Sequence, residues 1–117
     1  DGAVLVGVAG LALEQRERTA HKASLFGMYV RPAARSQGLA QQLVAAVLAH
    51  AAQSPGIEVV QLTVTESNTA AVRLYTRCGF MPFGVEPYAV RLGNQFLTKL
   101  HLWRRVGTAR LDRVNRA

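Results

Sequence analysis

The sequence predicts an α/β (α+β) fold in a single domain, with the element order strand, strand, helix, strand, helix, strand, strand. Its 117 residues, half of them hydrophobic, suffice for one hydrophobic core but are few for two. Apolar side chains recur at helical spacing in two segments, and a stop signal ends each of them. The other apolar runs are short and bounded by turn residues, as is typical of strands.

Two strands open the chain. Residues 3–15, "AVLVGVAGLALEQ", combine valine and leucine with interior glycines, which favours a buried strand over a helix. The charged residues that follow indicate a turn. A second strand covers residues 23–32, and Pro32 ends it because proline has no N–H to donate to the sheet. We expect these two strands to form a hairpin.

The first helix is predicted over residues 38–53. An apolar stripe three to four residues apart runs along it, formed by Leu39, Leu43, Val47 and Ala51, and the sequence Ser54-Pro55-Gly56 terminates it. The run "IEVVQLTV", residues 57–64, is then predicted to be the third strand.

The second helix is predicted over residues 69–78. Gly79 follows it where a left-handed C-cap is needed, and Phe80 is positioned to fold back on the last turn. Residues 83–92 and 95–103 are strand-like, and Gly93-Asn94 between them is a favourable hairpin turn. The last two strands are therefore expected to pair.

The segment between the second strand and the first helix, "RSQGLAQQL", suits an anion. The first N–H groups of a helix are unpaired and carry partial positive charge, so a phosphate placed there is stabilised. Gly38 and Ala40 keep the approach open, while Arg35 and Ser36 can add a charge and a donor. A glycine at such a junction more often makes a plain turn, so this segment alone is a weak signal. The nucleotide P-loop and the dinucleotide glycine pattern are both absent.

A longer stretch, "MYVRPAARSQGLAQQL", resembles the acyl-CoA pyrophosphate motif of GNAT-type N-acetyltransferases, in which Val-x-Pro leads into Arg/Gln-x-x-Gly-x-Gly/Ala. Arg35, Gly38 and Ala40 occupy its three defined positions. The stretch "NTAAVRLYTRCGF" is similar to a second signature of that family, Asn-x-x-Ala-x-x-Leu-Tyr-x-x-x-Gly-Phe. It matches at Asn68, Ala71, Leu74, Tyr75, Gly79 and Phe80.

The resemblance covers residues 3–103 and implies a mixed, mostly antiparallel sheet flanked by two helices. Family members carry a strand, two helices and another strand before the point at which this sequence opens. Residues 1–105 are therefore expected to be an N-terminally incomplete GNAT acetyltransferase domain. A missing strand would leave an exposed sheet edge, and such edges tend to pair with another chain, so we expect a homodimer.

The resemblance further implies an acyltransferase that moves the acetyl group of acetyl-CoA to a primary amine, by direct attack in a ternary complex. The pantetheine arm would lie in a gap between the second and third strands. The residues implied to contact acetyl-CoA are Met28, Tyr29 and Val30 on the strand, Arg35, Ser36, Gln37, Gly38, Leu39 and Ala40 at the diphosphate, and Asn68 and Ala71 at the start of the second helix. The Asn68 side chain would bond the pantetheine or hold the gap open.

Tyr75 takes the position of the family's general acid, where a phenol that stays protonated at neutral pH can protonate the departing CoA thiolate. The base is open. Thr63 aligns with a glutamate that serves some relatives and cannot replace it. Glu66, Glu86 and water remain as alternatives.

Other residues predict little chemistry. Cys78, the single cysteine, excludes an internal disulfide, fits a reducing cytoplasm, and is expected to be a packed thiol. The three histidines, His21, His50 and His101, lie too far apart in the sequence to suggest a metal site, and we expect none. No apolar run has the length of a membrane span, so a membrane is not expected as a partner.

The chain is basic, with a net charge of +7, of which +4 lies beyond Trp103. Residues 106–117 are expected to be a solvated or poorly ordered basic tail, and nucleic acid is not the favoured partner. The competing function is a catalytically weak or inactive CoA-binding or interaction module, which this tail would direct to RNA or the ribosome.

Overall fold

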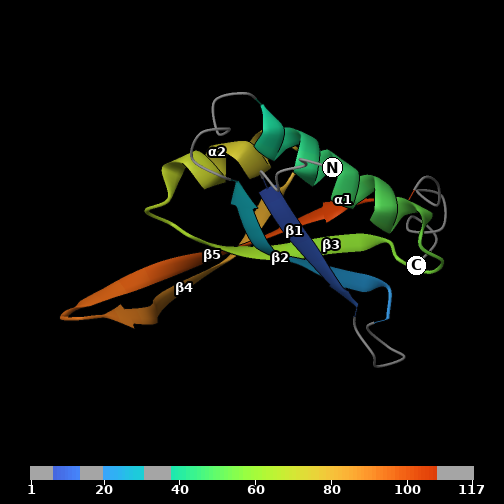
Figure 1. Ribbon diagram of the computed structural model, residues 1–117. Coiled ribbons are helices and arrows are strands. Elements are labelled where there is room, and N and C mark those ends of the chain that lie inside the picture. Colours follow the sequence, from blue (N-terminus) through green and yellow to red (C-terminus); the bar gives the residue numbers. More distant parts are fainter. Residues whose placement is uncertain (1–6, 14–19, 31–37, 108–117) are drawn as a thin grey trace.

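The computed structural model describes residues 7–13, 20–30 and 38–107, and in them five strands and two helices follow one another in the predicted order (Figure 1). The elements are β1 (Gly7–Leu13), β2 (Lys22–Val30), α1 (Leu39–Gln53), β3 (Val59–Thr65), α2 (Thr69–Arg77), β4 (Met81–Leu92) and β5 (Gln95–Arg105).

The five strands form one sheet in the order β1-β2-β3-β5-β4. Only β2 and β3 are parallel, and the other three neighbouring pairs are antiparallel. The predicted mixed, mostly antiparallel sheet is thus confirmed, together with the first and last hairpins. Gly93, at a φ of 62°, makes the turn between β4 and β5.

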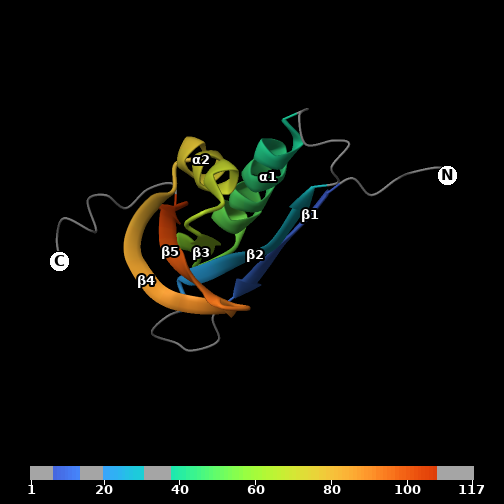
Figure 2. The same ribbon diagram turned by 90° about the vertical axis from the view of Figure 1, so that its left-hand side faces the viewer.

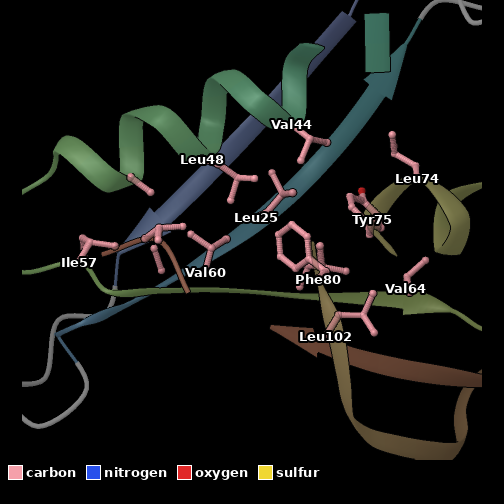
Figure 3. Packing of buried hydrophobic residues seen from close by; sticks show 14 residues of the cluster. Leu25, Val44, Leu48, Ile57, Val60, Val64, Leu74, Tyr75, Phe80 and Leu102 are labelled. Carbon is pink, nitrogen blue, oxygen red and sulfur yellow. The ribbon is translucent and has the colours of Figure 1, made fainter. Parts of the chain in front are cut away.

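Both helices cover the same face of the sheet (Figures 1 and 2). Strand β3 alternates accordingly, because Val60, Leu62 and Val64 are buried while Thr63 between them is exposed. Figure 3 shows Val60 and Val64 packed with side chains of both helices around Phe80, which is 2% exposed. The opposite face of the sheet is not covered by any element of the described residues.

The buried side of α1 is rotated from the predicted stripe. Its fully buried side chains are Val44, Leu48 and Ala51, whereas Leu43 and Val47 are only half-buried. The difference arises because α1 packs against both the sheet and α2. The residues that face the core therefore lie between the side of the helix that meets the sheet and the side that meets α2.

Strand β2 contains a β-bulge that the sequence did not reveal. The register advances three residues along β2, from Phe26 to Tyr29, where it advances two along β1. Gly27 lies in this stretch at a φ of 63°, a conformation that glycine adopts without strain. Because of the extra residue, Leu25 and Met28 both pack against the helical face although they are three residues apart.

The end of α2 is the predicted glycine stop. The N–H of Phe80 donates to the carbonyl of Tyr75 at 2.9 Å, and the N–H of Gly79 donates to that of Thr76 at 3.0 Å. This is the Schellman arrangement, with Gly79 at a φ of 92°. It fixes the Phe80 ring against Tyr75, the residue expected to do chemistry.

The structure bears on the predicted C-terminal boundary of the domain. Val106, which we assigned to the tail, is 9% exposed, belongs to the core and donates its N–H to Glu58, so the domain extends past residue 105. Residues 108–117 and the first six lie outside the described residues. Neither of the two described helices is both long and apolar enough to cross a membrane.

Candidate active site

A cavity of about 630 Å³ opens where β2 and β3 separate. The paired register of these strands covers only three positions and ends at Ser24 and Gln61, while both strands continue beyond it. The predicted gap between the second and third strands is therefore present. Its walls come from the far half of each strand, the first turn of α1 and the inner side of α2.

Several residues predicted to contact acetyl-CoA line this cavity. They are Met28, Tyr29 and Val30 of β2, Ala40 of α1, and Asn68 and Ala71 at the start of α2. The bulge in β2 at Gly27 determines which residues of this part of the strand face the cavity, and Gly27 itself lines the cavity. Arg35, Ser36 and Gln37 lie outside the described residues.

Tyr75 lines the same cavity from α2. It is 7% exposed, and its ring meets the Phe80 ring edge-on at a centroid distance of 5.7 Å. Burial raises the pKa of the Tyr75 phenol above its ordinary value of 10.0, with a smaller contribution from Cys78. The side chain therefore stays a proton donor at neutral pH, as a general acid must.

The first turn of α1 meets the cavity through Ala40, while Gly38 precedes the helix as its N-cap. Among the described residues, no side chain caps this end, so none of them occupies the first N–H groups of the helix. Gly38 has a φ of 72°, and a Cβ built on it would meet nothing within 4 Å. A glycine is thus required at position 38 by the left-handed backbone, and no described residue crowds the place of a Cβ.

Asn68 has a structural role that the motif alone did not predict. Its side-chain oxygen accepts the N–H of Ala71 at 3.1 Å and so caps α2. The amide NH₂ group is then the part of Asn68 left to donate to a ligand. The cap also fixes the first turn of α2 at the cavity wall.

The candidate bases lie elsewhere. Glu66 is exposed in the turn after β3 and does not line the cavity. Glu86, on β4, accepts from Nε2 of His101 at 3.0 Å. Thr63 lines the cavity, and its hydroxyl lies 3.4 Å from Nδ1 of the same histidine.

His101 is the residue that sequence reasoning missed. We set the three histidines aside as a metal site because they lie too far apart in the sequence, yet the β3–β5 register places His101 directly opposite Thr63. No local pattern carries that register. The signal available was indirect: Thr63 stands in place of a base, and the partner strand carries a histidine.

Cys78 is the C-cap of α2 and is half-buried. Burial raises the pKa of its thiol, while Arg77 and Arg104 act in the opposite direction. The net direction keeps the thiol protonated, in line with a packed side chain. Among the described residues, no group of three His, Cys, Asp or Glu side chains could hold a metal ion.

Comparison with known proteins points to one family. Residues 1–80 match the model described as "Acetyltransferase (GNAT) family". A mycothiol acetyltransferase of Salinispora tropica is 40% identical over 76 residues, which are 65% of this chain and 25% of that protein. A [ribosomal protein bS18]-alanine N-acetyltransferase of Haemophilus ducreyi is 41% identical over 59 residues, which are 50% of this chain and 40% of that protein.

Solved structures agree. A GNAT-family acetyltransferase of Streptococcus pneumoniae superposes with a TM-score of 0.81 at 26% identity, covering 87% of this chain and 60% of that one. The yncA protein of Salmonella typhimurium, solved with its cofactor acetyl-CoA, has a TM-score of 0.82 at 19% identity and covers 93% of this chain and 62% of that one. The chain thus spans a quarter of the mycothiol relative and about three fifths of these structures.

Proposed function

Since this chain belongs to the GNAT acetyltransferase family, we propose that it transfers the acetyl group of acetyl-CoA to a primary amine by direct attack in a ternary complex. The observation that carries the proposal is the cavity between β2 and β3. It brings Tyr75, the cap of α2 and the first turn of α1 around one space of about 630 Å³. These three features come from separate parts of the sequence. They would protonate the departing thiolate, bind the pantetheine arm and hold the diphosphate.

Acetyl-CoA would enter this cavity as an extended ligand. Its pantetheine arm would lie along Met28, Tyr29 and Val30, with the amide of Asn68 as a donor and Ala71 leaving room on α2. The diphosphate would meet the N–H groups at the start of α1, from Gly38 to Ala40, where the helix dipole favours negative charge. Arg35, Ser36 and Gln37 would complete that contact.

The chemistry needs two groups at the thioester. As the amine nitrogen bonds to the carbonyl carbon, charge develops on the oxygen, and a backbone N–H near Met28 would stabilise it. The C–S bond then breaks, and Tyr75 would give its proton to the departing thiolate. Burial supports this role because it keeps the phenol protonated until the thiolate forms.

The relatives suggest two acceptor classes, a small metabolite and the amino end of a protein. The Salinispora protein is named for mycothiol and the Haemophilus protein for alanine of a ribosomal protein. Both identities are near 40%, so we propose that one of these classes is the acceptor. We also propose a cytoplasmic location, which suits the free thiol of Cys78.

The test combines binding and turnover. Isothermal titration with acetyl-CoA measures binding, and release of free CoA thiol measures transfer to a peptide beginning with alanine, to mycothiol lacking its acetyl group, to a lysine peptide and to a polyamine. Tyr75→Phe keeps the ring against Phe80, so we expect unchanged affinity for acetyl-CoA and turnover lower by roughly 100-fold or more.

Tyr88→Phe is the matched control, since Tyr88 is 76% exposed on β4 and lies outside the cavity. Its turnover should equal that of the parent chain. Unchanged turnover in Tyr75→Phe would remove the acid role. Absence of acetyl-CoA binding would overturn the proposed function itself, and binding without turnover on any acceptor would favour the non-enzymatic CoA-binding module.

A further inference from the structure

A row of three polar side chains crosses three neighbouring strands on the face opposite the helices. Thr63 on β3 lies 3.4 Å from Nδ1 of His101 on β5, and Nε2 of His101 lies 3.0 Å from a carboxylate oxygen of Glu86 on β4. Each contact joins residues from different strands, so the row depends on the register of the sheet. It is absent from every sequence motif of the chain.

The row fixes the tautomer of the imidazole. An ionised carboxylate only accepts hydrogen bonds, so Nε2 carries the proton that Glu86 receives. In the neutral ring, Nδ1 then holds a lone pair, and it points to the Thr63 hydroxyl. This is how a carboxylate orients a histidine that serves as a base through its other nitrogen.

The row also lies where the two sides of the sheet communicate. Thr63 lines the cavity that holds Tyr75, and with His101 it lines a second cavity of about 390 Å³ on the open face. Phe26 and Phe83 border this second cavity, and the Phe83 ring lies 5.9 Å from the His101 ring. The two cavities adjoin where β2 and β3 part, since Leu25, Phe26, Gly27, Leu62 and Thr63 line both.

We infer that His101 is the general base for the acceptor amine and that Glu86 is its positioning residue. The inference rests on the proposed function. The amine approaches from the open face, its nitrogen bonds to the thioester carbon, and the proton it loses passes to Nδ1 of His101, with the Thr63 hydroxyl on the path. The electrons of the broken C–S bond stay on sulfur, which takes its proton from Tyr75.

A purely structural role for His101 is the alternative. Its side chain is 34% exposed and that of Glu86 is 53% exposed, so the pair adds little to stability by itself. A pair that contributes little to the fold but orients a lone pair toward the strand gap is better explained by chemistry. Among the described residues, the charged groups on the same face beside His101 are Glu86 and, on its own strand, Lys99, while the uncharged Gln61 and Thr65 lie on β3.

The experiment compares His101→Ala with His50→Ala in the acetyl-CoA assay, using an acceptor on which the parent chain turns over. His50 is an exposed residue of α1 that lines neither cavity, so its variant should match the parent. His101→Ala should lower kcat/KM by roughly 100-fold or more, because general-base catalysis contributes about that much. Its affinity for acetyl-CoA and its unfolding midpoint should stay unchanged.

Two further readouts separate a base from a packing residue. Free imidazole should restore part of the turnover of His101→Ala and leave the parent unaffected. As the pH rises, kcat/KM should increase more steeply in the parent than in His101→Ala, because the base and the acceptor amine must both be deprotonated in the parent and only the amine in the variant. Glu86→Gln keeps an acceptor for Nε2 but removes the charge, so we expect a loss of roughly tenfold in kcat with KM unchanged.

Parent-like turnover and pH dependence in His101→Ala would overturn the inference and leave the proposed function standing. A loss that imidazole does not repair, together with weaker acetyl-CoA binding, would also overturn it, since the residue would then act through the fold. If the parent turns over none of the acceptors, the proposed function fails first and this inference fails with it.

Discussion

The two faces of the sheet differ although the same strands build both. On the helical face, Val60, Leu62 and Val64 of β3 and Leu102 of β5 are buried in one cluster with side chains of α1 and α2, and Phe80 and Tyr75 lie at its centre. On the open face, the intervening residues include exposed aromatic side chains and the row Thr63, His101 and Glu86. One face is therefore specified by packing, and the other by the polar contacts that the register creates.

This difference teaches where function can be carried at low cost to the fold. Residues of the helical face are packed in the core, and burial raises the pKa of Tyr75 there. Residues of the open face can change with little loss of stability. We therefore expect the general acid, Tyr75, to be constrained by packing, and the residues of the open face, from which the acceptor amine approaches, to tolerate substitution.

The sharpest test of this contrast replaces one phenylalanine on each face. Phe80→Ala removes a ring that is 2% exposed, and the resulting cavity should cost about 3–5 kcal/mol of unfolding free energy. Phe83→Ala removes a ring that is 55% exposed and should cost less than about 1 kcal/mol. Chemical denaturation of both variants measures the two free energies. Similar losses would mean that the open face is packed in solution.

Sequence reasoning succeeded where local chemistry decides. Gly79 and Gly93 were predicted from a cap and a hairpin turn, and each has a positive φ, whereas Gly38 was expected only to keep the approach of an anion open and also has a positive φ. The order of elements followed, because each boundary was marked locally. The stripe of α1 was predicted slightly off, since its buried side depends on where α2 lies.

What the sequence could not reveal depends on register. The bulge at Gly27 changes which residues of β2 face the cavity, and the bulge near Phe83 sets which β4 residue lies beside His101. Both result from pairing between strands, to which single residues contribute weakly. Tyr75 was found from a motif, whereas the His101 row required the fold.

A second prediction separates fold from binding at the start of α1. Gly38→Ala places a Cβ on a residue with a φ of 72° and with no neighbour within 4 Å, so strain alone should cost roughly 1–2 kcal/mol. Acetyl-CoA affinity should also fall, because the first N–H groups of the helix shift. Thermal unfolding and isothermal titration measure the two effects.

Gly107→Ala is the control for that change. Its Cβ would make ordinary contacts of 3.7 Å with Glu58, and the site lies away from the β2–β3 cavity, so both measurements should match the parent. A Gly38→Ala protein with parent stability would contradict the left-handed conformation. Loss of stability without loss of affinity would instead remove the start of α1 from the binding site.

A third prediction uses the pKa of Tyr75. Because burial raises it above 10.0, the unfolded chain ionises this phenol first, and its contribution to stability is complete below about pH 10 and lost as pH rises through the folded pKa. Unfolding free energies from pH 9 to 11.5 should therefore fall more steeply in the parent than in Tyr75→Phe. In this measurement both proteins also carry the substitution Cys78→Ala, because the Cys78 thiol has a raised pKa as well and would add its own pH dependence. Equal slopes would contradict the burial of the phenol in solution.

The smallest expected effect concerns the edge of the sheet. Strand β1 ends the described sheet on one side, paired with β2, and its Leu13 is 54% exposed. We propose that the chain forms a homodimer through this edge, since edge strands tend to pair with another chain. Leu13→Lys should raise the dimer dissociation constant by roughly threefold in sedimentation equilibrium, because lysine on an edge opposes pairing.

Leu92→Lys, at a 63% exposed position on the opposite edge strand β4, should leave the dimer dissociation constant unchanged. A monomeric parent would refute this proposal, and an effect of Leu92→Lys alone would move the interface to the β4–β5 hairpin, where the aromatic pair Tyr88 and Phe96 is also exposed.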